Sequence, residues 1–299
     1  MNDSRKAYFG KTMLFGEYSV ILGSKALVNP LKSFSGQWKN CQPAAEHELL
    51  LQAELLKFVK HLETQETATT LLHLDALKQQ TQDGLWFDAD IPHGYGAGSS
   101  GAVVAAIYER FAFAPQKDLV LLKRELAQLE GYFHGNSSGL DPLCCLLAQP
   151  LLVENDGQIK VLEPFTSQDQ FVVYLHDSRL SGKTAPLMAY FHQQMHHQSF
   201  YKKVKQQWLP AVDDAIDGFM NKDDTLLFDS LHVISTFQLN HLQPMLPESI
   251  VETWKHGLAT GDFTMKLCGS GGGGFSLVFA NDSRKITTYF PAEHLIRIL

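Results

Sequence analysis

Apolar residues recur every three or four positions in several stretches of the chain, and this spacing is typical of amphipathic helices. In the clearest stretch, which begins at Asp118, one face carries Leu119, Leu122, Leu126, Leu129 and Phe133. Similar spacing predicts helices over residues 44–61, 185–195, 200–220 and 224–240. A turn is expected over residues 243–247.

Alternating polar and apolar residues, or short apolar runs between turn residues, predict the strands. Residues 7–23 are interpreted as two short strands, broken at Gly16 and Glu17. Further strands are expected over residues 85–91, 170–176 and 275–279. Residues 64–85 are polar with short apolar patches, and no chemistry is assigned to residues 44–85. The periodicity therefore indicates a mixed α/β chain.

A glycine-rich loop follows the strand at residues 85–91. Residues 91–102 read Ile-Pro-His-Gly-Tyr-Gly-Ala-Gly-Ser-Ser-Gly-Ala, and the apolar run 103–107 comes next. The glycines allow the backbone to curl, and Ser99 and Ser100 are expected to cap the following helix. The unpaired N–H groups and the dipole of a helix start stabilise negative charge, so the loop is a candidate polyphosphate site.

The residues of this loop allow two other interpretations. Gly96-x-Gly98-x-x-Gly101 also matches the dinucleotide-binding fingerprint. That fingerprint needs a second strand ending in an acidic residue about 20 residues further on, and the sequence continues into helical patterns instead. A purely structural glycine turn stays open on these residues alone.

Two acidic residues follow the loop at positions that suggest chemistry. Glu130 lies at the edge of the apolar face of the predicted helix, where a carboxylate is costly unless a cation or metal accompanies it. The alternative is a glutamate at the rim that reaches solvent. Asp141 follows a turn of small polar residues and precedes Pro142, which is also an ordinary turn feature.

The C-terminal half contains three further candidates. Gly182-Lys183-Thr184 resembles the end of a Walker A loop, but Asp177 stands where that pattern requires glycine, so this interpretation is rejected. The histidines His192, His196 and His197 include a metal-ligand spacing, yet no nearby acid or cysteine completes a site, and a solvated helix face is favoured. Residues 271–274 are four consecutive glycines, which suggests that a ligand or another backbone approaches closely.

Composition limits the classes of partner. The 299 residues are 44% hydrophobic, enough for one large or two closely associated domains. The formal charge is −7 and no basic run exceeds a pair, so neither nucleic acid nor an anionic membrane is an expected partner. No 18-residue apolar stretch and no signal-peptide core are present, so a cytoplasmic location is expected.

Cysteine spacing points to the same compartment. The chain has four cysteines, none in C-x-x-C spacing, and this usage favours reduced thiols over disulfides or a zinc site: Cys41, Cys144, Cys145 and Cys268. No metal held by cysteine is therefore expected.

Three separated motifs together resemble the GHMP kinase superfamily. They are residues 10–17 (Gly-Lys-x-x-Leu-Phe-Gly-Glu), residues 92–102 (Pro-x-Gly-x-Gly-x-Gly-Ser-Ser-Gly-Ala) and residues 266–274 (Lys-Leu-x-Gly-x-Gly-Gly-Gly-Gly). Between them, Glu130 and the segment 134–141 (His-Gly-Asn-x-Ser-Gly-x-Asp) are similar to the mevalonate kinase branch in residues and spacing.

The resemblance implies an α+β fold, a two-lobed α/β sandwich. Residues 1–165 would form the ATP-binding lobe, similar to the second domain of ribosomal protein S5, with a left-handed βαβ crossover against the usual right-handed rule. Residues 166–299 would form a ferredoxin-like C-terminal lobe.

The resemblance also implies ATP and Mg²⁺ as cofactors and assigns a role to each motif. Asp141 and Lys11 would be catalytic, and Ser100 and Glu130 would hold Mg²⁺. The ATP phosphates would bind to Gly94, Gly96, Gly98, Ser99, Ser100, Gly101 and Ala102. The acceptor substrate would contact Glu17, Tyr18, Thr184, Gly271 and Gly272.

Two residues depart from the mevalonate kinase pattern. Tyr18 stands where that branch usually has the histidine thought to face the acyl substrate, which leaves the acceptor less certain than the reaction. Gly101 stands where alanine is usual, and this change is expected to leave phosphate binding intact.

The sequence thus predicts an ATP-dependent small-molecule kinase. Its favoured reaction converts mevalonate to 5-phosphomevalonate for isoprenoid precursor synthesis. Phosphomevalonate, homoserine, a galactose-type sugar or another small hydroxylated acid stays open as the acceptor, and so does a catalytically silent nucleotide-binding relative. The only expected partner class is a small-molecule substrate; the oligomeric state is left open, a homodimer included.

Overall fold

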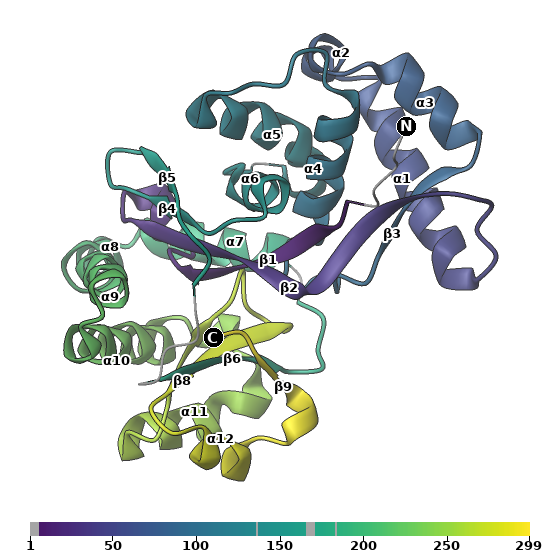
Figure 1. The fold of residues 1–299 in the computed structure, drawn as a ribbon. Coiled ribbons are helices and arrows are strands. Elements are labelled where there is room, and N and C mark those ends of the chain that lie inside the picture. Colours follow the sequence, from purple (N-terminus) through teal and green to yellow (C-terminus); the bar gives the residue numbers. More distant parts are fainter. Residues whose placement is uncertain (1–5, 136, 166–170, 183) are drawn as a thin grey trace. The chain divides into compact units, whose positions relative to one another are not determined.

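A computed structural model describes residues 6–135, 137–165, 171–182 and 184–299. The chain forms two compact units, and each is built from three separate segments. The first unit contains residues 1–11, 30–92 and 98–149, and the second contains residues 12–29, 93–97 and 150–299. Figure 1 shows the elements of both units along the chain. The lobe boundary expected after residue 165 stays a prediction.

The first unit combines helices with the outer part of strand β2 (Ala26–Asn40). The alternation of residues 85–91 predicted a strand, and the structure has β3 there (Leu85–Ala89). Residues 36–40 of β2 pair antiparallel with it. Strand β1 (Tyr8–Phe15) begins in this unit. The helices are α1 (Glu46–Leu62), α2 (Glu66–Leu71), α3 (Leu74–Gln82), α4 (Ser99–Phe111), α5 (Leu119–His134) and α6 (Leu140–Leu147).

Helix α5 forms over the stretch whose apolar spacing predicted a helix from Asp118 onward. The Asp118 carboxylate caps it by accepting hydrogen bonds from the N–H groups of Val120 and Leu121, at 3.0 and 2.9 Å. The inward face is confirmed for three of its leucines, which are at most 4% exposed: Leu122, Leu126 and Leu129. Phe133, near the end of the helix, was expected on the same face but is 38% exposed. This face fixes the rotation of the helix, and with it the direction of the neighbouring Glu130 side chain.

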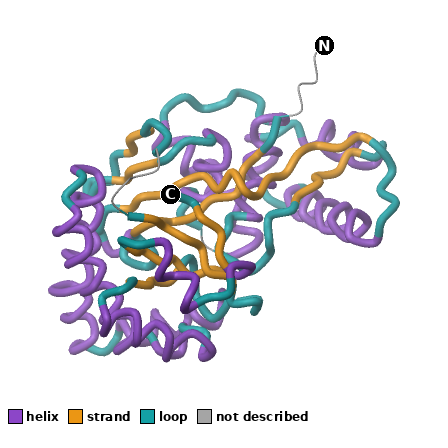
Figure 2. Tube along the Cα trace, turned by 60° about the horizontal axis from the view of Figure 1, so that its bottom comes forward, coloured by secondary structure: helices purple, strands orange, loops and turns teal. Residues whose placement is uncertain are grey.

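The second unit is built on a four-stranded antiparallel sheet in the order β7-β8-β6-β9. Figure 2 distinguishes the strands of the chain, in orange, from its helices, in purple. These strands are β6 (Val172–Asp177), β7 (Thr264–Leu267), β8 (Phe275–Ala280) and β9 (Leu295–Arg297). In the same unit, the first residues of β2 pair with β4 (Leu151–Val153), which pairs with β5 (Ile159–Val161). All of these pairings are antiparallel.

Helices complete the second unit, and those predicted from periodicity are confirmed. They are α7 (Thr184–Met195), α8 (Gln198–Lys203), α9 (Leu209–Asn221), α10 (Asp224–His241), α11 (Glu248–Thr260) and α12 (Ser283–Tyr289). Short helical turns stand at η1 (Val20–Leu22), η2 (Val204–Trp208), η3 (Gln243–Met245) and η4 (Ala292–His294). Among the helices of the described ranges, none combines the length and the apolar character that crossing a membrane requires.

The second short strand expected within residues 7–23 is wrong. One strand, β1, ends at Phe15, and the chain then turns into η1. Gly16 has a φ of 116° and Tyr18 a φ of 61°, both outside the range of a strand. A Cβ on Gly16 would lie 2.5 Å from the Cβ of Ala26, so the close approach of these two segments requires glycine there.

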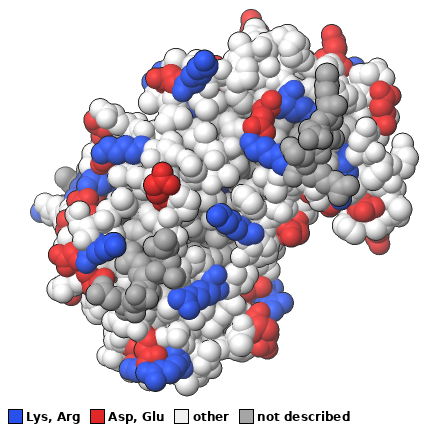
Figure 3. All heavy atoms as spheres, viewed as in Figure 1, with Lys and Arg blue, Asp and Glu red and all other residues white. Residues whose placement is uncertain are grey.

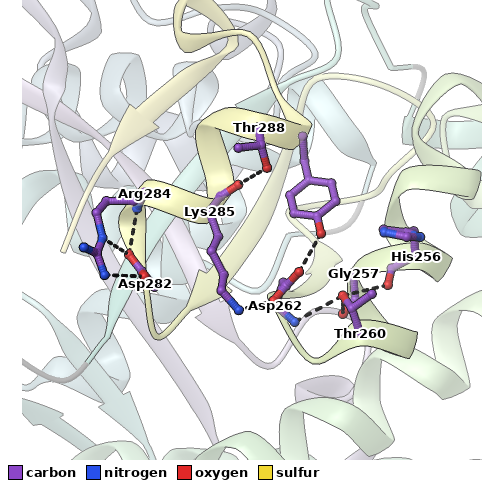
Figure 4. Close-up of polar contacts among 9 residues, drawn as sticks. His256, Gly257, Thr260, Asp262, Asp282, Arg284, Lys285 and Thr288 are labelled. Carbon is purple, nitrogen blue, oxygen red and sulfur yellow. Dashed lines mark hydrogen bonds and ion pairs between the residues drawn. The ribbon is translucent and has the colours of Figure 1, made fainter.

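Polar contacts at the surface join elements of the second unit. Asp262 accepts hydrogen bonds from Lys285 and from the Tyr289 hydroxyl, which ties α12 to the turn before β7 (Figure 4). Asp282 caps α12 by accepting from the Arg284 N–H at 2.9 Å. Over the face drawn in Figure 3, acidic and basic side chains are interspersed.

His176 on β6 is a buried base, 4% exposed, whose Nδ1 has no hydrogen-bond partner. Burial, and secondarily the neighbouring His294, lower its pKa to about 4. Between pH 6.5 and 4 the unfolded chain therefore binds a proton that the folded chain does not, so stability falls as the pH falls. We expect this group to make the protein about 2 kcal/mol less stable at pH 5 than at pH 7.

Urea unfolding of the wild type and of His176→Gln at both pH values measures this effect. The variant should lose most of that pH dependence, while Tyr201→Phe, which alters an exposed ring on α8, should keep it. An unchanged slope in His176→Gln would show that other groups produce the pH dependence.

Candidate active site

In the first unit, the glycine loop ends at the start of helix α4. Gly98 is the N-cap, with a φ of 79°, and no side chain caps the helix. The prediction that Ser99 or Ser100 caps it is therefore wrong, because both serines already lie within the first turn. A Cβ on Gly98 would lie 2.7 Å from Cγ of Lys11, so glycine lets the loop approach the lysine.

Lys11 and Asp141 form an ion pair within the first unit. The Lys11 Nζ lies 2.8 Å from an Asp141 carboxylate oxygen. The lysine side chain is 4% exposed and the aspartate side chain 28% exposed. Asp141 stands in the first turn of α6, where the helix dipole favours negative charge. The structure thus brings together the two residues that the sequence assigned to catalysis, and it leaves the carboxylate accessible.

Glu130 is only 2% exposed, so the alternative in which it reaches solvent is wrong. One of its carboxylate oxygens accepts a hydrogen bond from the Ser100 hydroxyl at 2.9 Å, and the other from Ser137 at 2.5 Å. Burial and, less strongly, the charge of Asp141 raise the pKa of this carboxyl. Sequence reasoning missed Ser137; its only signal was a position among the small polar residues before Asp141.

The donors around Glu130 fit a magnesium ion chemically. A carboxylate and a hydroxyl are hard oxygen ligands, and Mg²⁺ typically binds one or two carboxylates together with substrate phosphates. A carboxyl whose pKa is raised by burial is a group that a cation would stabilise in its charged form. Within the described ranges, no group of three or more His, Cys, Asp and Glu side chains could hold a metal.

Gly101 lies where helices α4 and α6 approach closely. A Cβ at this position would lie 2.9 Å from the backbone carbon of Asp141 and 2.9 Å from the nitrogen of Pro142. Alanine here must push the backbone of Asp141 away. We therefore expect Gly101→Ala to lower the catalytic rate about tenfold or more, because displacements of about 1 Å in an active site have effects of this size or larger.

The matched control is Gly131→Ala in helix α5, where an added Cβ has no atom within 4 Å. This variant should keep the wild-type rate and gain up to about 1 kcal/mol of stability from helix propensity. Steady-state kinetics and urea unfolding of both variants test the contrast. Equal rates in Gly101→Ala and Gly131→Ala would contradict it.

In the second unit, residues 93–97 of the glycine loop contact the C-terminal glycine loop, residues 269–274. A Cβ on Gly96 would lie 2.8 Å from the carbonyl oxygen of Cys268. The Gly94 carbonyl accepts a hydrogen bond from the Gly182 N–H at 3.1 Å. Sequence reasoning noticed Gly182 only in a rejected Walker A pattern. In the structure it belongs to a segment that contacts both glycine loops.

The C-terminal glycine loop has an unusual backbone. Five of its six residues have positive φ: Gly269, Gly271, Gly272, Gly273 and Gly274. The Gly272 N–H donates to the Met245 carbonyl at 2.6 Å, and the Gly274 N–H to the Leu180 carbonyl at 2.5 Å. The close backbone approach that four consecutive glycines indicated is confirmed.

Glu17 and Tyr18 are both buried in the second unit, at 6% and 7% exposed. Both Glu17 carboxylate oxygens lie 2.7 Å from the Nζ of Lys266. Lys266 is in strand β7, shortly before the C-terminal glycine loop. The Tyr18 hydroxyl donates to the Ser270 carbonyl at 2.7 Å. Thr184 begins helix α7, and its side chain lies outside the described residues. The assignment of these residues to the acceptor substrate stays a prediction.

Comparison with known proteins links this arrangement to a family. Residues 55–149 match the family described as GHMP kinases N terminal domain. A search of curated proteins finds no match. This region holds the helix start at Gly98, Glu130 and Asp141.

Solved structures share the fold over nearly the whole chain. The L. major mevalonate kinase in complex with R-mevalonate has 18% identity and a TM-score of 0.67, over 99% of this chain and 95% of that one. The Methanococcus jannaschii mevalonate kinase has 15% identity and a TM-score of 0.62, over 100% and 98%. The Streptococcus pneumoniae phosphomevalonate kinase has 13% identity and a TM-score of 0.64, over 98% and 97%.

At these identities the solved structures establish the fold alone, and the family match is limited to residues 55–149. The fold is α+β, as the resemblance implied, and the structure gives it two antiparallel sheets. Residues 55–149 are therefore similar to the N-terminal domain of GHMP kinases, and the chain as a whole has the fold of the solved GHMP kinases.

Proposed function

We propose that this protein transfers the γ-phosphoryl group of ATP to a hydroxyl group of a small molecule, with mevalonate as the favoured acceptor. The observation that carries the proposal is the 2.8 Å ion pair between Lys11 and Asp141 in the same unit as the helix start at Gly98. This ion pair holds a partly exposed carboxylate next to a buried cation. Phosphoryl transfer depends mainly on the positioning of the reactants and on compensation of their charge, and the pair can contribute to both.

The phosphates of ATP are assigned to the loop and the first turn of α4. Positive φ at Gly94, Gly96 and Gly98 turns the loop, and the N-terminal end of α4 has the positive end of the helix dipole, which stabilises a bound anion. The proposed phosphate contacts are Gly94, Gly96, Gly98, Ser99, Ser100, Gly101 and Ala102. Mg²⁺, held by Ser100 and Glu130, would neutralise charge on the β- and γ-phosphates when bound.

Asp141 is proposed to orient the acceptor hydroxyl and to take its proton. Lys11 lies 2.8 Å from this carboxylate and pairs with its negative charge, and its own positive charge would lower the pKa of a hydroxyl bound beside them. The chain has all three residues that the mechanism requires: Asp141, its cationic partner Lys11 and Glu130. Their presence favours an active kinase over a silent nucleotide-binding relative.

The choice of mevalonate rests on the likeness of Glu130 and residues 134–141 to the mevalonate kinase branch. A similar structure, that of the L. major mevalonate kinase, is a complex with R-mevalonate. Phosphomevalonate is the main alternative, because the S. pneumoniae phosphomevalonate kinase has a comparable TM-score. Homoserine and galactose complete the set of acceptors to be tested.

ADP release by the purified protein, with Mg²⁺-ATP and each of these four acceptors, tests the proposal. Turnover with mevalonate alone is the expected result. Turnover with another acceptor would retain the kinase and replace the substrate. ATP binding without turnover on this panel or on a wider metabolite screen would favour the silent relative.

A further inference from the structure

The peptide around Tyr18 has a strained conformation. The Ser19 N–H donates a hydrogen bond to the Glu17 carbonyl at 2.7 Å, two residues earlier, which makes Tyr18 the centre of a γ-turn. Its φ is 61°, and a γ-turn with positive central φ is the rare, strained form. A bulky non-glycine residue keeps such a conformation only where surrounding contacts impose it. The contacts of Glu17 and Tyr18 therefore indicate which part of the structure requires this turn.

The residues of this turn have partners in distant parts of the sequence. Glu17 forms its buried ion pair with Lys266, which directly precedes Leu267, Cys268 and the glycine loop. The ring of Tyr18 lies 4.7 Å, centroid to centroid, from that of Phe191 on α7. Its hydroxyl donates to the carbonyl of Ser270, within the glycine loop, at 2.7 Å. The turn therefore contacts both Lys266, in the strand before the C-terminal glycine loop, and Ser270 within that loop.

The C-terminal glycine loop depends on such contacts for its shape. Glycine loses more conformational freedom on ordering than any other residue, and this loop contains five glycines. Its N–H groups at Gly272 and Gly274 are tied to the backbone of η3 and of the segment after β6. The Tyr18 hydroxyl adds a side-chain tie at Ser270, between Gly269 and Gly271.

We propose that Tyr18 is a positioning residue that holds the glycine loop 269–274 in the conformation that receives the acceptor substrate. Only the link between the loop and the acceptor substrate rests on the proposed function. The stabilisation of the loop by Tyr18 does not depend on what the protein binds. The phenol acts through its hydrogen bond to Ser270 and does not itself react. The strained turn keeps that hydroxyl in place.

Tyr18→Phe tests the proposal by removing one oxygen and leaving the ring. Hydrogen–deuterium exchange of the full-length protein without ligands should show exchange at residues 268–274 that is about fivefold faster, because the hydrogen bond to the part-buried Ser270 carbonyl contributes on the order of 1 kcal/mol. Exchange in β8 and α10 should be unchanged. The matched control, Tyr201→Phe, alters a 45% exposed tyrosine and should leave the exchange of the loop at its wild-type rate.

Kinetics then test the acceptor part of the proposal. Tyr18→Phe should raise the KM for the acceptor about tenfold while the KM for ATP changes less than twofold. Unchanged exchange in the loop, or exchange that accelerates equally throughout the second unit, overturns the role of Tyr18. Faster exchange in the loop with a wild-type acceptor KM overturns the link to the substrate. A protein that phosphorylates none of the acceptors contradicts the proposed function, and the exchange result still decides whether Tyr18 holds the loop.

Discussion

Asp141→Asn is expected to lower kcat by on the order of 10³-fold, the usual range for removing a general base that a mechanism requires. The amide keeps the shape of the side chain, but it neither accepts a proton nor carries the charge that pairs with Lys11 at 2.8 Å. Binding of ATP should change little, because the phosphates are assigned to the loop and to α4. Steady-state ADP release and calorimetric titration with ATP separate the two effects.

The control for this prediction is Asp75→Asn, which alters an exposed acid in the first turn of α3. It removes the same charge from the same kind of helix position and should keep kcat within about twofold, as expected of a surface substitution. A kcat for Asp141→Asn within threefold of the wild type would remove Asp141 from the chemistry. Loss of ATP binding in proportion to kcat would point to a damaged fold.

Lys266→Met is expected to reduce the free energy of unfolding by about 3–5 kcal/mol, the usual cost of leaving one partner of a buried ion pair alone. The side chains of Lys266 and Glu17 are 2% and 4% exposed, and the lysine also donates to the Leu267 carbonyl at 2.7 Å. Urea unfolding measures the loss. The exposed pair Lys255 and Glu252 provides the control, because Lys255→Met breaks a surface contact worth about 0–1 kcal/mol.

A double-mutant cycle with Glu17→Gln sharpens this prediction. If the cost arises from an unpaired carboxylate, Glu17→Gln combined with Lys266→Met should be more stable than Lys266→Met alone. The coupling free energy should then be about 1–3 kcal/mol. Additive losses would show that the two side chains stabilise the fold independently and that the ion pair is not the cause.

The sequence predicts the elements whose signals are local. Helix α5 and its leucine face follow from spacing within one helix, and the structure confirms them. The same spacing placed Glu130 at the edge of that face and left its burial open, which the structure decides at 2% exposed. The glycine run 271–274 correctly indicated a close backbone approach, because few other arrangements require so many glycines in one loop.

Features that depend on contacts between distant residues could not be predicted in this way. The partner of Glu17 stands 249 residues away, so no local pattern identifies it. The strand expected after Gly16 fails because a strained turn at Tyr18 overrides the β propensity of its apolar residues. Ser99 and Ser100 look like caps in the sequence, but Gly98 takes that position and the Ser100 hydroxyl instead donates to Glu130.

The pairing of β2 with β4 has a consequence for synthesis on the ribosome. Val28 pairs with Leu151. About 120 further residues must therefore be synthesised before the first residues of β2 can pair with β4. At about 5–20 residues per second, that interval lasts about 6–24 s. During this time the edge is open to pairing with other nascent chains, and folding in the cell should therefore benefit from a chaperone that binds the emerging N-terminal segment.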